Sequence, residues 1–216
     1  MKIKILLISL LSLCVMGASA QRNKEDYKID KSAKSRSSKS NLDMIYGVSV
    51  GYMIPYIDID GGIDTSIKKG YKYGIMWGID LGLIEIVPEL WYSNFEVDLD
   101  GSGSISGMTL KNKSIEIPII FSLDLPLSRT RLNVGPSFSV MCDNDLVSKS
   151  GTKTEFGRIK NNIGYVVGVS STFFGHILVD TRFTGRFGSS TNELPTGSSQ
   201  YNIKCYDLSL SVGYKF

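Results

Sequence analysis

The sequence predicts an all-β protein, an eight-stranded antiparallel up-and-down transmembrane β-barrel. From Ile45 onward apolar residues recur with a period of two rather than 3.6, which indicates strands and not helices. Long polar linkers alternate with short turns, as the connections of such a barrel do. Lysine is absent from most of the predicted strands. A soluble lipocalin-like barrel is the alternative, because alternation alone does not say which face points outward.

The first twenty residues predict export. Lys2 and Lys4 precede an apolar stretch, and Ala18 and Ala20 supply the small-residue pattern that signal peptidase cleaves, so residues 1–20 are expected to be a signal peptide. A retained helical anchor is the alternative, but the apolar run is shorter than the roughly 20 residues that cross a bilayer.

Lipidation at Cys14 is a second alternative for the same segment. It is disfavoured because Leu13 precedes the cysteine, where a small residue is needed.

A basic segment follows. Between Gln21 and Lys39 seven Lys/Arg stand against three Asp/Glu, with almost no apolar residues. Such a composition cannot offset the entropy of ordering the chain, so residues 21–44 are expected to be a disordered basic periplasmic segment. A nucleic-acid-binding arm is the alternative, but export argues against it, and no nucleic-acid partner is expected.

The barrel domain is expected over residues 45–216. Its last strand shows the clearest alternation, with Leu208, Leu210, Val212, Tyr214 and Phe216 on one face. The other predicted strands cover residues 46–52, 77–83, 84–95, 115–124, 131–140, 162–169 and 177–184. The faces of the strand over 84–95 are ambiguous.

The linkers predict the topology. Long Gly-rich loops are expected over 55–72, 98–112, 143–160 and 188–203, and short turns over 83–85, 126–130 and 174–176. With the N-terminus in the periplasm, the four long loops would lie outside the cell.

Three observations favour a membrane barrel over a soluble one. No lysine lies within 73–110, 114–148 or 161–203, although a soluble surface would normally use lysine there. The polar face is mostly Gly, Ser and Asn, which suits a narrow lumen. Aromatic residues gather near the strand ends, as interfacial girdles do. The expected location is the outer membrane of a Gram-negative bacterium, in contact with its lipid.

Four motifs occur in order along the predicted barrel: IVPELWYS from Ile86, IEIPII from Ile115, GPSF from Gly135 and VDTRF from Val179. This succession resembles the PorT-like outer-membrane β-barrel family over roughly residues 41–216. The resemblance accounts for prolines inside three strands, where proline is normally avoided. It implies an eight-stranded barrel whose C-terminal strand carries a signal for the barrel-insertion machinery, and it implies no activity.

Charged residues on the polar face are expected to lie in the lumen. They are Asp80, Glu116, Arg131, Asp180, Arg182, Arg186 and Asp207, with Glu89 on the strand whose faces are ambiguous. Unpaired charges would be destabilising inside a narrow barrel, so opposite signs should pair. A narrow polar pathway is the functional alternative to this structural network.

A partial calcium-loop pattern begins at Asp98. Asp98, Asp100 and Ser102 match the first ligand positions, but the twelfth position is Thr109 and lacks the bidentate carboxylate. A flexible hairpin loop is therefore favoured over a metal site. No cofactor is expected.

The remaining reactive residues do not suggest catalysis. His176 is the single histidine and falls in a predicted periplasmic turn, which leaves none for a triad or a zinc site. Cys142 and Cys205 are expected at the extracellular rim on strands that are not neighbours. A disulfide needs Cα atoms within about 7 Å, so their pairing stays open.

These features predict a non-enzymatic outer-membrane barrel that displays four extracellular loops for surface binding or envelope integrity. A narrow transporter or a secretion-accessory barrel is one alternative. A soluble periplasmic ligand-binding barrel is the other. The extracellular partner is not specified by any residue.

Overall fold

The computed structural model describes residues 43–59, 63–101, 106–125, 130–149, 151–155, 163–187, 190–193 and 200–216. The predicted signal peptide with Ala18 and Ala20, most of the predicted basic segment, and Ser102 lie outside these ranges. No helix among the described residues is long and apolar enough to cross a bilayer.

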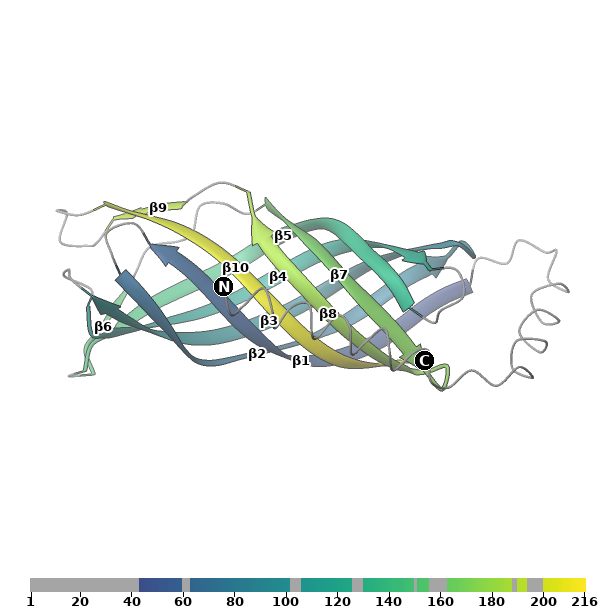
Figure 1. Cartoon of the computed structure of the whole chain (residues 1–216), viewed down its shortest axis with the longest axis horizontal. Coiled ribbons are helices and arrows are strands. Elements are labelled where there is room, and N and C mark those ends of the chain that lie inside the picture. Colours follow the sequence, from purple (N-terminus) through teal and green to yellow (C-terminus); the bar gives the residue numbers. More distant parts are fainter. Residues whose placement is uncertain are drawn as a thin grey trace, which may run out of the picture.

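Eight strands form a closed antiparallel ring, which confirms the predicted fold class (Figure 1). The strands, in ring order, are β1 (Asp43–Ile59), β2 (Ile63–Asp80), β3 (Ile84–Gly101), β4 (Met108–Asp124), β5 (Thr130–Val147), β7 (Ile163–Phe173), β8 (Ile177–Arg186) and β10 (Gln200–Lys215). Two short strands, β6 (Lys153–Glu155) and β9 (Ser190–Glu193), pair with β5 and β10. Pairing of β1 with β10 closes the ring, so no long edge is left open.

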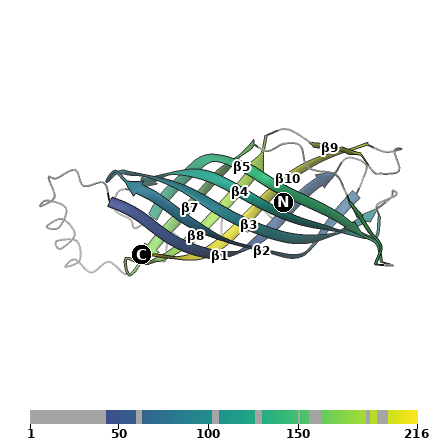
Figure 2. The ribbon, with the colours of Figure 1, turned by 180° about the vertical axis from the view of Figure 1, so that it is seen from behind.

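The two ends of the barrel differ (Figures 1 and 2). At one end, here the terminal end, β1 begins, β10 ends, and short connections join β2 to β3, β4 to β5 and β7 to β8. The connection from β7 to β8 is a tight turn closed by a 3.2 Å hydrogen bond from the His176 amide to the Phe173 carbonyl, with positive φ at Phe174 and Gly175. At the other end, here the hairpin end, the remaining connections are made.

The strands continue through much of the four linkers predicted as long loops, and those loop boundaries are wrong. β1 and β2 reach Ile59 and Ile63, and β3 and β4 reach Gly101 and Met108. Along these extensions β1 pairs with β10, β2 with β3, and β3 with β4. The physical reason is that apolar and polar residues also alternate in these segments, but with the apolar ones facing inward and the polar ones facing outward. β1 also begins at Asp43, two residues before the predicted start of the barrel.

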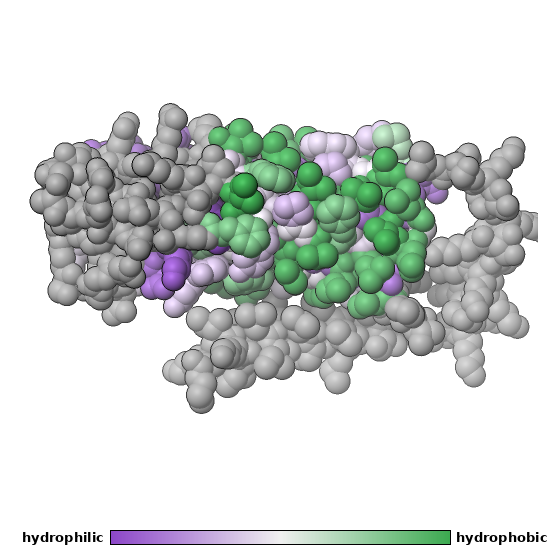
Figure 3. All heavy atoms as spheres, turned by 90° about the horizontal axis from the view of Figure 1, so that it is seen from above, coloured by the Kyte–Doolittle hydropathy of each residue, from purple (hydrophilic) through white to green (hydrophobic). Residues whose placement is uncertain are grey.

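An apolar belt surrounds the barrel over its terminal end and middle. The strand residues predicted to be apolar and outward are exposed there, and Figure 3 shows apolar residues covering this part of one face. Examples from five strands are Val50, Ile75, Phe121, Val134 and Val212. Because a closed barrel satisfies its backbone hydrogen bonds internally, such a belt can lie in hydrocarbon. The soluble-barrel alternative requires these side chains to point inward, and they do not.

Toward the hairpin end the polarity of the two faces is reversed, with polar residues on the outer face and apolar residues on the inner one. On β3, Leu90 and Tyr92 face outward within the belt, whereas Glu96 and Asp98 occupy the same outward face further along. Inside, positions that include Glu89 and Ser93 are followed by the buried apolar side chains Phe95, Val97 and Leu99. We call the part of the wall beyond Tyr92 and its neighbours the extension. Asn94 to Gly101 alone gives roughly 25 Å of strand at about 3.3 Å per residue.

A bulge in β5 changes which residues face the lumen. Glu116 on β4 pairs with Ser139 and Ile115 pairs with Met141, so Val140 is the extra residue. Before the bulge odd-numbered residues such as Ser137 point inward, and after it even-numbered residues such as Asn144 do. Without this shift, the apolar residues of the β5 extension would face water.

Candidate functional site

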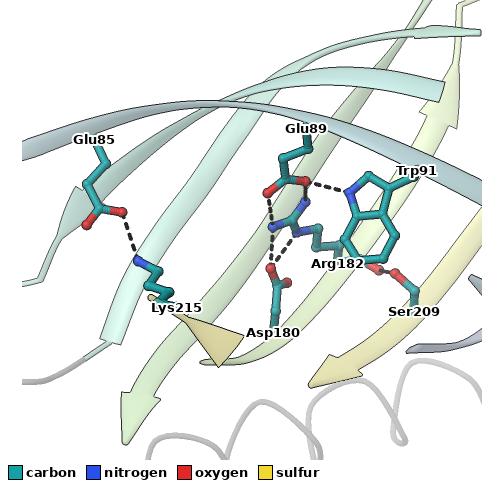
Figure 4. Close-up of polar contacts among 7 residues, drawn as sticks. All are labelled: Glu85, Glu89, Trp91, Asp180, Arg182, Ser209 and Lys215. Atoms are coloured by element: carbon teal, nitrogen blue, oxygen red, sulfur yellow. Dashed lines mark hydrogen bonds and ion pairs between the residues drawn. The ribbon is translucent and has the colours of Figure 1, made fainter. Parts of the chain in front are cut away.

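The central feature of the lumen is a buried charged cluster around Arg182 (Figure 4). Arg182 on β8 makes a two-pronged contact with the Glu89 carboxylate on β3, through Nη1 to Oε2 and through Nη2 to Oε1, the latter at 2.9 Å. Its Nε also donates to Asp180 Oδ2 at 2.6 Å. All three side chains are at most 5 % exposed. A guanidinium held by two carboxylates suits such a buried position, because its planar donors match carboxylate geometry.

Trp91 completes this cluster. Its indole Nε1 donates to Glu89 Oε2 at 2.6 Å, so one carboxylate oxygen serves both the tryptophan and the arginine. The ammonium of the buried Lys72 lies 4.7 Å from the centre of the Trp91 ring, and the Arg182 guanidinium lies 5.9 Å from it. Cations over an indole face are attracted by its quadrupole, and the attraction is greater without water. We call Lys72, Glu89, Trp91, Asp180 and Arg182 the central cluster.

The Glu89–Arg182 contact crosses the barrel. In the ring order, β3 and β8 are four strands apart in both directions, so they are diametrically opposite. The two residues are 93 positions apart in the chain. The contact fixes the distance between opposite walls at the level of the belt.

Two further ion-pair groups lie above and below this cluster. Toward the hairpin end, Arg186 Nη2 approaches Glu116 Oε1 at 3.2 Å. Toward the terminal end, Arg131 contacts Glu85 at 2.7 Å and Asp124 at 2.6 Å.

The second group continues through Lys215, whose Nζ lies 3.3 Å from Glu85 Oε2 (Figure 4). It therefore connects β3, β4, β5 and β10 around the terminal opening.

Two buried apolar clusters occupy the lumen on either side of the central cluster. Along β3, Val87 belongs to one of them, which also contains Met76, Ile120, Val166 and Leu178. Phe95, Val97 and Leu99 belong to the other, together with Met53, Ile57, Leu110 and Leu146. Between them are two cavities of about 20 Å³ each, both bordered by Glu116 and Asp207. A cavity of this size holds about one water molecule, so side chains fill most of the lumen around these two cavities.

The predicted lumen charges separate into three groups. Glu116, Arg131, Asp180, Arg182 and Arg186 form the ion pairs described above. Asp207 borders the cavities instead. Asp80 lies at the terminal end, where its carboxylate accepts a 2.6 Å hydrogen bond from the Gly82 amide and caps the turn between β2 and β3.

Sequence reasoning missed several members of these groups. Glu89 was ambiguous and is central, because odd-numbered residues of β3 face inward. The sequence predicts Lys72 at the end of a loop, whereas it is a buried residue inside β2. It predicts Glu85 in a turn and leaves the face of Trp91 open, whereas both side chains are buried in β3. The glutamates at 85 and 89 share one parity with Trp91, and that parity was the available signal.

The outer face of the extension carries a row of alternating charges across neighbouring strands. The register aligns Lys69, Glu96, Lys111 and Asp145 on β2, β3, β4 and β5. Glu96 Oε1 lies 3.0 Å from Lys69 Nζ and 3.1 Å from Lys111 Nζ. Partial burial raises the pKa of Glu96, but the hydrogen bonds and charges of these two lysines outweigh it and leave the pKa lowered.

Asp98, the first residue of the partial calcium pattern, is in this extension rather than in a flexible loop. Its Oδ1 accepts hydrogen bonds from Thr109 at 2.6 Å and from Lys68 at 3.1 Å. The Thr109 hydrogen bond and then the Lys68 ammonium lower the pKa of Asp98. Asp100 is exposed on the same face of β3. Among the described residues, no three His, Cys, Asp or Glu side chains are arranged to hold a metal.

His176 and the two cysteines of the barrel lie apart from the central cluster. His176 lies in the terminal-end turn, stacked on Tyr214 with ring centres 5.4 Å apart, and its Nδ1 is 3.0 Å from the Lys215 carbonyl. Cys205 is on β10, while Cys142 is on β5 and its side chain lies outside the described residues. β7 and β8 separate those two strands in the ring.

The C-terminal set alternates along β10 as expected from its sequence. Leu210, Val212, Tyr214 and Phe216 are exposed on the outer face, with Leu208 half-buried on that face. β10 is the strand that closes the barrel against β1. The set is therefore displayed on the outer face at the closing seam.

No model of a protein family matches the chain, and no curated protein matches it. The resemblance to the PorT-like family therefore stays a prediction from its motifs.

Among solved structures, the chain is similar to the Neisserial surface protein A, at 15% identity and a TM-score of 0.46, over 80% of this chain and 97% of that one. It is also similar to Ail, the attachment invasion locus protein of Yersinia pestis, at 10% identity and a TM-score of 0.47, over 81% of this chain and 100% of that one. A third similar structure is the outer membrane protein OprG from Pseudomonas aeruginosa, at 12% identity and a TM-score of 0.42, over 80% of this chain and 94% of that one. At such identities and scores these likenesses say nothing about activity.

Proposed function

We propose that this chain is a non-enzymatic outer-membrane β-barrel that presents its extension outside a Gram-negative cell as a binding surface or a structural element of the envelope. The observation that carries the proposal is the exchange of faces along β3, where an apolar outer surface gives way to the charged one at Glu96 and Asp98. A wall of this kind stands partly in lipid and partly in water.

The side chains that fill the lumen support a display role rather than transport. Around the central cluster, two buried apolar clusters and the ion pairs across the lumen leave two spaces of about 20 Å³ each. An eight-stranded barrel filled with side chains gives rigidity without a channel. The narrow transporter is therefore the weaker candidate.

Orientation and insertion belong to the same proposal. The short turns and both termini of the barrel would face the periplasm, after removal of residues 1–20. The outward side chains at the end of β10, Val212, Tyr214 and Phe216, would be read by the barrel-insertion machinery.

Two measurements test the proposal together. Intact cells treated with a membrane-impermeant amine reagent should be labelled at the exposed lysines Lys68, Lys69 and Lys111 of the extension. The purified barrel in a planar bilayer should carry no steady current. Labelling only after cell lysis would contradict the orientation, and a reproducible ohmic current would favour the transporter.

A variant of the extension tests the binding role. Replacing Lys68, Lys69, Lys111 and Lys113 by glutamine removes positive charge from the outer face without touching the lumen. If the extension is a binding surface, cell adhesion should fall while the amount of folded barrel stays the same. The control is V134S/V167S, which changes outward residues of the belt.

A further inference from the structure

An apolar groove of about 750 Å³ lies on the outer wall of the belt, over β10, β1, β2 and β3. Its base consists of Val48, Val50 and Val212, with the backbone at Gly74 and Gly213. Val212 pairs with Val50 across one strand boundary and Val50 pairs with Tyr73 across the next. The base is therefore continuous across neighbouring strands.

Aromatic side chains form the two sides of the groove. On one side, Tyr73 and Tyr92 lie with ring centres 5.0 Å apart. On the other, Tyr214 is stacked on His176 at 5.4 Å with an interplanar angle of 12°. Small valines between two aromatic pairs make the hollow, and the ring contacts within each pair hold its sides in place.

The chemistry of the lining limits what can fill the groove. It is continuous with the belt and thus lies within the hydrocarbon of the membrane. Water would need several polar partners, which valine and glycine do not supply. An extended polypeptide segment would bring backbone N–H and C=O groups that require hydrogen bonds in lipid, and the lining offers none in the necessary number. A hydrocarbon chain meets both conditions.

The size and direction of the groove fit one lipid molecule. At the roughly 30 Å³ that a water-sized group takes in a liquid, the volume corresponds to on the order of 25 methylene groups, more than one ordinary acyl chain. The groove ends near Ile177 and Tyr214, beside the terminal-end turn that contains His176. In the orientation proposed above, that end lies at the periplasmic leaflet.

We propose that this groove is a binding site for one phospholipid of the periplasmic leaflet, with its acyl chains along the valines and its headgroup beside His176. The choice of leaflet rests on the orientation given under the proposed function. The presence of the groove does not depend on that orientation. The bound lipid exchanges more slowly than the lipids around the rest of the belt, because the aromatic sides restrict it.

The test is native mass spectrometry of the full barrel in detergent, with added dipalmitoyl phosphatidylethanolamine as the probe. V50F and V212F each fill the base of the groove with an outward side chain. V134F is the matched control, because Val134 is also an outward, exposed valine, on β5 and away from the groove. The faster gel migration of unheated samples verifies that every variant is folded.

We expect the wild type and V134F to retain one phospholipid, and V50F and V212F to lose most of it, a several-fold drop in the adduct. No adduct on the folded wild type, or equal adducts on V50F and V134F, would overturn the proposal. Retention of palmitate but not of the phospholipid would overturn it too, as would a barrel dimer that V50F disrupts. Lysine labelling of intact cells tests the orientation separately. A wrong orientation and an absent lipid site can therefore be told apart.

Discussion

Glu89 and Arg182 join diametrically opposite strands of the barrel through a two-pronged, fully buried ion pair. Asp180 and Trp91 complete the hydrogen bonding of both groups. Most pairs in an antiparallel barrel connect neighbouring strands, where the backbone ladder already fixes the distance. This one acts across the lumen, where no backbone hydrogen bond does.

Removing the Glu89 carboxylate should therefore destabilise the barrel strongly. We expect E89A to lower the free energy of unfolding by about 3–5 kcal/mol, because the buried Arg182 guanidinium and Trp91 indole lose their shared partner. Urea unfolding of the barrel in lipid vesicles, followed by fluorescence, measures the change. D100A on the exposed face of the same strand should change it by less than about 0.5 kcal/mol. Equal effects of the two variants would contradict the bridging role.

The extension should depend on its inner apolar residues rather than its outer ones. Leu99 is completely buried among the apolar residues at the hairpin end, so L99A should lower the unfolding free energy by about 2–5 kcal/mol. L90A, on the outer face of the same strand, should have a smaller effect because lipid chains refill the space. The same urea experiment compares them. A larger loss in L90A would mean that the assigned faces are wrong.

Acid should weaken the extension through Asp98. Its pKa is lowered by the Thr109 hydrogen bond and by Lys68, so the carboxylate stabilises the fold above its ordinary pKa of 3.8. That contribution is lost as the pH falls through the lowered value. A carboxyl NMR titration should show the pKa of Asp98 rising in T109V and in K68M. K113M, a lysine change without a contact to Asp98, is the control and should leave it unchanged.

The exposed end of β10 should matter for assembly. Phe216 is 74% exposed on the outer face at the closing seam. We expect F216S to reduce the heat-modifiable, folded fraction in outer membranes several-fold. V167S is the control, since it removes an exposed apolar residue from the belt on another strand. Equal yields for F216S and V167S would argue against a C-terminal signal.

The turn between β7 and β8 holds the only non-glycine residue with positive φ among those described, Phe174 with φ 52°. A left-handed conformation costs a bulky residue about 1–2 kcal/mol, and a turn of this kind prefers Asn-Gly. F174N should therefore raise the free energy of unfolding by up to about 1 kcal/mol. Urea unfolding of both proteins in detergent measures the change in unfolding free energy. A decrease instead would show that the exposed ring contributes more through lipid contact than it loses in strain.

Much of the barrel could be predicted because lipid and lumen impose a simple alternation. The outer face of β10 from Leu208 to Phe216 and the inner positions of Asp180 and Arg182 follow from parity alone. The extension could not be found this way. From Asn94 onward the outer side chains of β3 are polar and the inner ones apolar, which is the reverse of the pattern used to locate membrane strands.

The missed members of the central cluster have a related cause. Lys72 follows shortly after Lys68, Lys69 and Gly70, which indicate a loop. Its burial involves Trp91, which is remote in sequence. The partnership of Glu89 with Arg182 depends on ring closure, which places strands β3 and β8 opposite each other. No local pattern contains that information.

The Glu89–Arg182 contact also has a consequence for the order of events when the chain enters the membrane. Glu89 belongs to the third strand of the ring, but its partner follows 93 residues later. A barrel that inserted one hairpin at a time would carry the Glu89 carboxyl group into the membrane long before the Arg182 guanidinium arrived. We therefore expect insertion to be favoured only once β8 is present to supply Arg182, so that completion of the barrel depends on a strand made late in the chain.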